Sequence, residues 1–187
     1  MAYNLVTERM VFRSSGPELT EAVLDYYLRN RDFFSKAEPE RTDTYFTAEY
    51  QLQLQELEKK NIEKGLSAYY YGSLKTDPNR IIFSVSYVNI RKAPYYSTIF
   101  GYDLDEELQG HGYATEAILA SIDDVLKKHE IHRIEARVLP DNIKSVSILE
   151  NVGFSYEGIE KSSILLRGKF RDHKRYAYIN ENFMKEL

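Results

Sequence analysis

Residues 97–115 read STIFGYDLDEELQGHGYAT and hold the most informative pattern in the chain. The pattern predicts a strand, an acidic loop and a turn with Gly110 and Gly112. A helix then runs from Thr115 to about His129, because apolar residues recur there at helical spacing. A strand, a glycine turn and a helix N-terminus together can hold an anion, since free N–H groups and the helix dipole both point at it.

The two glycines have two interpretations. They remove side chains where a ligand phosphate would approach the backbone. The turn is not a dinucleotide-binding fingerprint, because Thr115 stands where the last glycine is needed, and no Gly-Lys-Ser/Thr follows as in a Walker loop. Taken alone, glycines before a helix more often make only a tight turn, so an anion site and a plain turn both stay open.

The flanking sequence predicts alternating helices and strands. Before the turn we expect a helix from about Pro17 to Asn30, a second helix from about residues 43–47 to 64–65, strands at 67–74 and 81–90 with a turn at 76–79, and a strand at 97–104. The second helix carries an apolar stripe of Phe46, Tyr50, Leu54 and Leu57, and its other face is polar. After the turn we expect strands at 131–139, from Phe154 and at 176–180, a short helix closed by Gly153, and a solvated basic hairpin at 167–175.

The composition favours one globular domain, residues 1–187, in the cytoplasm. Hydrophobic residues make up 43% and charged residues 29% of the chain, so it can bury a core. The net charge of -4, without a basic block, argues against direct nucleic-acid binding and suits a basic partner. With no cysteine there is no disulfide, thiolate metal site or cysteine nucleophile. We expect no signal peptide and no membrane span, because no apolar run is long enough.

The turn matches a coenzyme-binding motif. Residues 109–114, QGHGYA, fit the pattern Q/R-x-x-G-x-G/A, and this part of the chain resembles the GNAT superfamily of acetyl-CoA-dependent N-acetyltransferases. Further segments are similar in order and spacing to the branch that acetylates N-termini of ribosomal proteins: residues 5–13, 115–117, 132–136, 140–145, 149–154 and 157–158. Phe83 departs from the family, since many members have glycine there in the third strand, so the substrate side need not follow the family's shape.

The resemblance implies an α/β fold with a mixed, mainly antiparallel sheet flanked by helices. It also implies that acyl-CoA binds where the fourth and fifth strands splay apart. Backbone N–H groups of the turn would hold the pyrophosphate, and the strand end would offer unpaired backbone groups to the pantetheine and the thioester carbonyl. The coenzyme-binding residues implied in this way are Tyr102, Asp103, Leu104, Gln109, Gly110, His111, Gly112, Tyr113, Ala114, Thr115, Asn142 and Ser145. His111 either lends partial charge or is an exposed turn residue, and Asn142 contacts the pantetheine, caps the next helix, or does both.

Catalysis needs a proton donor for the leaving thiolate and a neutral amine. The resemblance implies Ser145 as the general acid, and its spacing from Asn142 puts both on the same side of a helix start. The alternative is a first-turn hydroxyl bonded to backbone. Three residues stay open as the base: Glu157, Tyr102 and Glu116, the last of which also suits an electrostatic or structural role at the helix start.

The resemblance implies N-acetyl transfer from acetyl-CoA to a primary amine, with a protein N-terminal α-amine, such as that of a ribosomal protein, as the leading acceptor. A small-molecule amine (a polyamine, amino sugar or amino acid) and a non-catalytic CoA-binding module are the alternatives. The tyrosines at 69–71 and 95–96 either line a substrate groove or pack in strands. The histidines lack metal-ligand spacing, so we expect no metal. A homodimer is compatible with the sequence.

Overall fold

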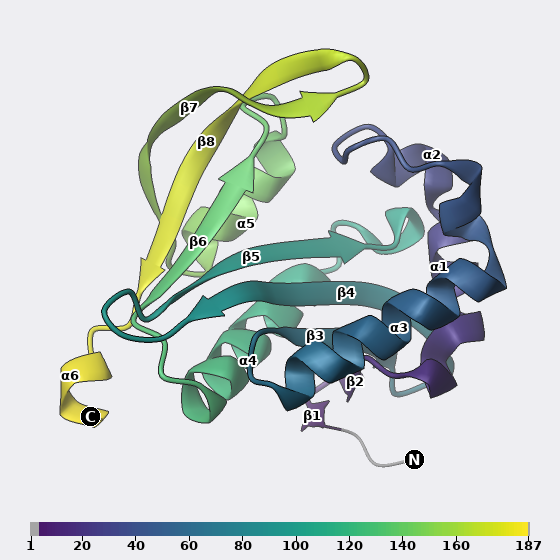
Figure 1. The fold of residues 1–187 in the computed structure, drawn as a ribbon, viewed down its shortest axis with the longest axis horizontal. Helices are drawn as coiled ribbons and strands as arrows, with labels where there is room; N and C mark the ends of the chain where they lie inside the picture. Colours follow the sequence, from purple (N-terminus) through teal and green to yellow (C-terminus); the bar gives the residue numbers. More distant parts are fainter. Residues whose placement is uncertain (1–3, 187) are drawn as a thin grey trace.

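The computed structural model describes residues 4–186, and a single eight-stranded sheet runs through it (Figure 1). The strands are β1 (Leu5–Val6), β2 (Met10–Ser14), β3 (Ala68–Leu74), β4 (Asp77–Arg91), β5 (Ser97–Leu104), β6 (Arg133–Val138), β7 (Ser155–Leu166) and β8 (Lys169–Ile179). Their order is β1-β2-β3-β4-β5-β6-β8-β7, and every neighbouring pair is antiparallel except β5 and β6. The mixed, mainly antiparallel sheet that we predicted is confirmed.

Helices cover both faces of this sheet. They are α1 (Thr20–Arg29), α2 (Arg31–Phe34), α3 (Ala48–Glu63), α4 (Tyr113–Lys128), α5 (Ile143–Asn151) and α6 (Phe183–Glu186), with short 3-10 turns at Pro17–Leu19, Asp43–Phe46 and Glu106–Leu108. In Figure 1, α3 crosses in front of the sheet and α4 lies behind it. Among the described residues, no helix combines the length and the apolar character that a membrane span requires.

The sheet divides between β5 and β6. These strands pair in parallel only from Ser97 opposite Arg133 to Phe100 opposite Ala136. Beyond Phe100, β5 continues beside β4 alone, whereas β6 continues beside β8. The parallel step is possible because α4 provides the crossover connection. The two strands therefore part in a V, which opens a cleft through the middle of the sheet.

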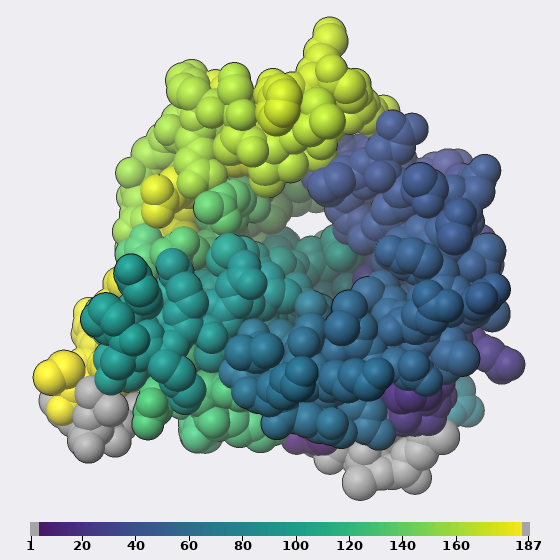
Figure 2. Space-filling model, viewed as in Figure 1, coloured from purple at the N-terminus to yellow at the C-terminus, as the bar shows by residue number. Residues whose placement is uncertain are grey.

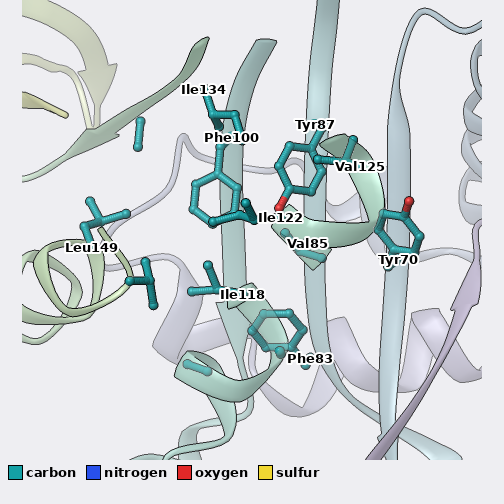
Figure 3. Close-up of a cluster of buried hydrophobic side chains, with 14 of the residues drawn as sticks. Tyr70, Phe83, Val85, Tyr87, Phe100, Ile118, Ile122, Val125, Ile134 and Leu149 are labelled. Atoms are coloured by element: carbon teal, nitrogen blue, oxygen red, sulfur yellow. The ribbon is translucent and has the colours of Figure 1, made fainter. Parts of the chain in front are cut away.

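The larger core lies between the sheet and α4. Ile118, Ile122 and Val125 form one face of α4, as the helical spacing predicts, and they pack on β-strand residues that include Tyr87 and Phe100 (Figure 3). Tyr87 is fully buried, and its hydroxyl group forms a hydrogen bond of 2.8 Å with Ser121. This core fixes the start of α4, and with it the glycine turn, against the end of β5.

The orientation of α3 differs from the prediction. Two members of its predicted apolar stripe face solvent, since Leu57 is 54% exposed and Tyr50 is 39% exposed. Gln51, Gln55 and Glu58 are buried instead. Gln55 and Glu58 have tertiary partners: Ser15 Oγ donates to Glu58 Oε2 at 2.6 Å, and Gln55 Nε2 donates to Tyr71 Oη at 3.1 Å. A polar face can be buried when its hydrogen bonds are made.

Three strand boundaries also differ. The predicted strand at residues 5–13 is two strands, joined by a turn at Thr7–Arg9. The turn predicted at 76–79 is a two-residue turn at 75–76, and Pro78 lies near the start of β4, where a strand tolerates proline. The last strand begins at Lys169 rather than Tyr176, because the predicted basic hairpin is the tip of the longer β7–β8 pair.

The core predicts a clear contrast between two neighbours on α4. Ile118 is fully buried, so Ile118→Ala should lower the free energy of unfolding by about 2–5 kcal/mol through lost burial and a residual cavity. Leu119 is 49% exposed, so Leu119→Ala should change it by less than about 0.5 kcal/mol. Urea denaturation of both variants measures this. Equal losses would mean that α4 does not present this face to the sheet.

Candidate active site

A cleft of about 1200 Å³ opens where β5 leaves β6. Most residues expected to bind a coenzyme line it: Tyr102, Asp103, Leu104, Gln109, Gly110, Gly112, Ala114, Thr115, Asn142 and Ser145. His111, Tyr113 and Glu157 are not among the lining residues. The space-filling view shows an opening through the molecule in this region, between the β7–β8 hairpin, α2 and β5 (Figure 2).

The end of β5 separates the cleft into two halves. Adjacent residues of a strand point to opposite faces of the sheet. Tyr102 lies on the face covered by α4, where its ring stacks on Phe83 at 6.1 Å. Asp103 lies on the other face, in register with Ser84 and, on the next strand, Tyr71. The cleft therefore reaches the end of β5 from both sides of the sheet.

The glycine turn has the backbone shape of an anion site. Gly110 and Gly112 have φ values of 80° and 78°, in the left-handed region that glycine adopts without strain. Gly112 directly precedes α4, and no side chain caps the first turn of that helix. The N–H groups of this turn are consequently available to an anion in the cleft. Lys144 adds a positive charge beside them, since its Nζ donates to Gln109 Oε1 at 2.8 Å.

Arg9 and Glu116 brace this turn from outside the cleft. Glu116 accepts hydrogen bonds from Thr7 Oγ1 at 2.6 Å, from Arg9 N at 2.8 Å and from Arg9 Nε at 2.6 Å. Burial opposes the charge on Glu116, but these bonds outweigh it and lower the pKa of its carboxyl group. Arg9 also donates to the carbonyl oxygen of His111 at 2.8 Å. Glu116 is thus a structural anchor, and Arg9 is a site residue that no sequence pattern indicated.

His111 and Tyr113 belong to the same brace. The Nδ1 atom of His111 lies 2.9 Å from the carbonyl oxygen of Gln109, and its ring stacks on Tyr113 at 6.1 Å. The guanidinium group of Arg9 lies over the ring of Tyr113, 4.3 Å from its centroid. Of the two interpretations of His111, the placement favours the exposed turn residue, because its ring bonds to its own loop.

Two of the predicted catalytic residues meet in the cleft. Tyr102 Oη donates to Ser145 Oγ at 3.1 Å. Asn142 Oδ1 accepts from Ser145 N at 3.2 Å, so Asn142 caps α5 and fixes the backbone of Ser145. Burial raises the pKa of Tyr102 to about 12, with partial opposition from its bond to Ser145. Tyr102 therefore keeps its proton near neutral pH and suits a donor better than a base.

Glu157 is not brought to this pair. It lies on β7 and accepts two hydrogen bonds from Arg133, one of them at 2.8 Å, with Arg175 3.9 Å away. The hydrogen bonds from Arg133 are the main cause that lowers the pKa of Glu157, and the charge of Arg175 lowers it further. The structure thus places this predicted base in an ion-pair network outside the cleft lining.

The half of the cleft opposite the glycine turn has a floor of small residues and polar walls. Ser84, Ser86 and Gly101 lie side by side on β4 and β5 and leave the floor open. The walls include the aromatic residues Tyr27, Phe33, Phe34, Tyr69 and Tyr71 and the charged residues Lys36, Glu38, Arg41 and Glu58. Tyr69 and Tyr71 thus line the groove as one interpretation predicted, whereas Tyr70 is buried and donates to Asp124.

The part of the chain that the structure describes contains no cluster of His, Cys, Asp or Glu suited to a metal.

A bridge closes this half of the cleft on its outer side. Arg167, at the turn of the β7–β8 hairpin, donates to the carbonyl oxygen of Ser35 at 3.1 Å and to its hydroxyl group at 2.9 Å. Ser35 directly follows α2. The hairpin and the α2 segment therefore meet above the opening seen in Figure 2, and a molecule in the cleft would lie beneath them.

Known proteins share this architecture. Residues 9–155 match the family described as Acetyltransferase (GNAT) domain. The chain is 31% identical over 170 residues to a ribosomal protein uS5-alanine N-acetyltransferase of Escherichia coli, covering 90% of this chain and 87% of that one. A crystal structure of ribosomal-protein-S5-alanine acetyltransferase from Vibrio fischeri is 31% identical and superposes with a TM-score of 0.91 over 95% of this chain and 97% of that one.

A third similarity concerns the fold alone. Mycobacterium smegmatis RimJ in complex with CoA-disulfide superposes with a TM-score of 0.85 at 23% identity, covering 92% of this chain and 83% of that one. The family match and the E. coli relative both span most of the chain. The chain therefore belongs to the GNAT family and is an acetyl-CoA-dependent N-acetyltransferase.

Proposed function

We propose that this enzyme acetylates a protein N-terminal α-amine, with an N-terminus of a ribosomal protein as the leading acceptor. The observation that carries the proposal is the cleft that reaches the end of β5 from both faces of the sheet. One face carries the features that suit a coenzyme, and the other is an open groove beneath the Arg167–Ser35 bridge. An extended chain end is slender enough to enter beneath such a bridge.

On the coenzyme face, the N–H groups of residues 110–115 would hold the pyrophosphate, and Lys144 would add charge. Among the described strands, none pairs with the β6 side of β5 beyond Phe100, so the backbone groups there would face the pantetheine and the thioester. Asn142 uses its oxygen to cap α5, which leaves its amide N–H group for the pantetheine arm. These assignments put the thioester near the Tyr102–Ser145 pair.

The proton chemistry favours an α-amine. An α-amine has a pKa of about 7.7–8.0 and is partly neutral at physiological pH, whereas a lysine amine, at about 10.4, is almost fully protonated. The leaving thiolate gains a proton from Ser145, which the Tyr102 hydroxyl in turn supports. We call the half of the cleft opposite the glycine turn the acceptor groove. Its acidic residues Glu38 and Glu58 suit a positively charged chain end such as that of a ribosomal protein. Such an acceptor would place the reaction in the cytoplasm.

The glycine turn can be tested through coenzyme affinity. Gly112→Ala should weaken acetyl-CoA binding by roughly 5- to 30-fold. A side chain disfavours φ 78° by about 1–2 kcal/mol, so the free turn relaxes to another backbone shape and binding has to restore the original one. Isothermal titration calorimetry measures the Kd. Gly65→Ala, at φ 67° after α3, carries the same backbone cost far from the cleft and should leave the Kd unchanged. An unchanged Kd for Gly112→Ala would remove the turn from the coenzyme site.

The Tyr102–Ser145 pair can be tested through turnover. Ser145→Ala should lower kcat by about 10²-fold while acetyl-CoA binds as before, since a positioned proton donor contributes on that order. Ser155→Ala, on an exposed position of β7, is the matched control and should keep full activity. If Ser145 is only a first-turn hydroxyl group, its alanine variant will keep a kcat within a few fold of the wild type.

A panel of acceptors tests the substrate class. Acetyl transfer should be about 10²-fold faster to a short peptide with a free N-terminus than to the same peptide with a blocked N-terminus and an internal lysine, because fewer lysine amines are neutral. Spermidine, glucosamine and free amino acids complete the panel. Turnover with these small amines and with no peptide would replace the protein N-terminus by a small-molecule acceptor.

A further inference from the structure

Glu38 and Asp103 form a carboxyl pair in the acceptor groove. Asp103 was expected only to offer its backbone to the coenzyme, but its side chain points to the opposite half of the cleft from Tyr102. Glu38 lies in the segment after α2, 65 positions earlier in the chain, and also lines the cleft. The two side-chain carboxyl groups lie within hydrogen-bonding reach of each other.

Several groups hold this pair in place. Ser84 forms a side-chain hydrogen bond with Asp103, and the Tyr26 hydroxyl group donates to the carbonyl oxygen of Asp103 at 2.9 Å. Arg41 forms an ion pair with Glu38. The guanidinium group of Arg41 lies over the rings of Tyr27 and Tyr45, 4.5 and 4.3 Å from their centroids, so two adjacent aromatic rings help to hold it.

A hydrogen bond between two carboxyl groups requires that one of them carries a proton. Burial, followed by the nearby charge of Asp103, raises the pKa of Glu38 to about 9. Burial also raises the pKa of Asp103. The pair therefore holds one proton between its two members at neutral pH and has a charge of about −1, which Arg41 balances from one side only.

We propose that Glu38 and Asp103 together bind the ammonium group of the acceptor and take its proton before transfer. The proposal rests on N-acetyl transfer as the reaction and adds the residues that prepare the amine. Their position fits this role, because they line the half of the cleft that lies across β5 from the glycine turn. A carboxylate with a raised pKa also accepts a proton from an α-amine at less cost than an ordinary carboxylate does.

The proposed step balances. An N–H bond of the ammonium breaks, an O–H bond forms on the ionised carboxyl group, and the nitrogen keeps the electron pair. That pair forms the C–N bond at the thioester carbonyl carbon, and the C–S bond breaks with its electrons on sulfur. The nitrogen loses its second proton as the amide forms, and this proton replaces the one that Ser145 gives to sulfur. The carboxyl pair releases its extra proton to solvent once the amide leaves.

Other ionisable groups near the pair come from every element packed against it. They are Tyr26 and Tyr27 on α1, Lys36 and Arg41 in the segment around Glu38, Tyr45 in the 3-10 turn before α3, Glu58 on α3, Tyr71 on β3, and Arg137, Arg171 and His173 across the cleft. Burial raises the pKa of Tyr27, Tyr45 and Tyr71, so these hydroxyl groups stay neutral near pH 7. Among these neighbours, Arg41 is the cation in contact with Glu38.

The test is the pH profile of Asp103→Asn, which keeps the shape of the side chain and removes the ionised member of the pair. With a peptide acceptor, kcat/KM should fall by about 10²-fold at pH 6.5–7, where most of the acceptor is protonated. The loss should shrink to a few fold above pH 9, because a neutral amine needs no proton acceptor. Glu38→Gln should lose less activity, because its amide N–H group can still donate to Asp103 as the protonated carboxyl group does, and the acetyl-CoA Kd should not change in either variant.

Glu40→Gln provides the matched control, since Glu40 is an exposed carboxylate two positions from Glu38 and does not line the cleft. Thermal unfolding verifies that each variant is folded. A loss equal at every pH, or no loss at all, would overturn the proposal. If the wild-type enzyme acetylates only small amines, the same profile is measured with one of them, so an error in the acceptor class and an error in the carboxyl pair give different results.

Discussion

The early end of pairing between β5 and β6 is the constraint on which the rest of the site depends. After Phe100 and Ala136 the two strands separate, because β6 follows β8 while β5 stays with β4. An open strand edge inside a sheet leaves backbone groups that need partners. In this enzyme a substrate can supply them, and the same opening connects the two faces of the sheet. Binding and reaction therefore share one structural cause.

The V alone would not place a coenzyme. The coenzyme position that we propose depends on the glycine turn, whose shape is held from outside by the Arg9–Glu116 pair and from inside by the packing of α4 on the sheet. Such a brace keeps the N–H groups of the turn aimed before a ligand arrives, so that binding does not have to order them. Both carboxylate oxygens of Glu116 accept hydrogen bonds in this brace, so Glu116 does not suit the role of a base.

Sequence reasoning succeeded where the chemistry is local. The glycine turn, the α4 face with Ile118 and the Asn142–Ser145 helix start are each encoded within a few residues, and the structure has them as predicted. It failed where side chains meet across long stretches of chain. Arg9 and Glu116 are 107 positions apart, and the buried polar face of α3 depends on Ser15 and Tyr71. No motif surrounds Glu38. Its partner Asp103 lies on a strand that we had assigned only to the coenzyme.

In the proposed reaction, the two faces of β5 also divide the proton transfers. Tyr102 and Asp103 are adjacent in sequence, yet one side chain supports the donor Ser145 and the other joins the carboxyl pair with Glu38. If the donor and the acceptor of protons shared one pocket, they would bond to each other and neutralise both functions. Strand alternation points the adjacent side chains of Tyr102 and Asp103 to opposite faces of the sheet and so keeps the two pockets apart. A strand end that is open on both faces thus offers an amine and a thioester separate proton partners at a single point of attack.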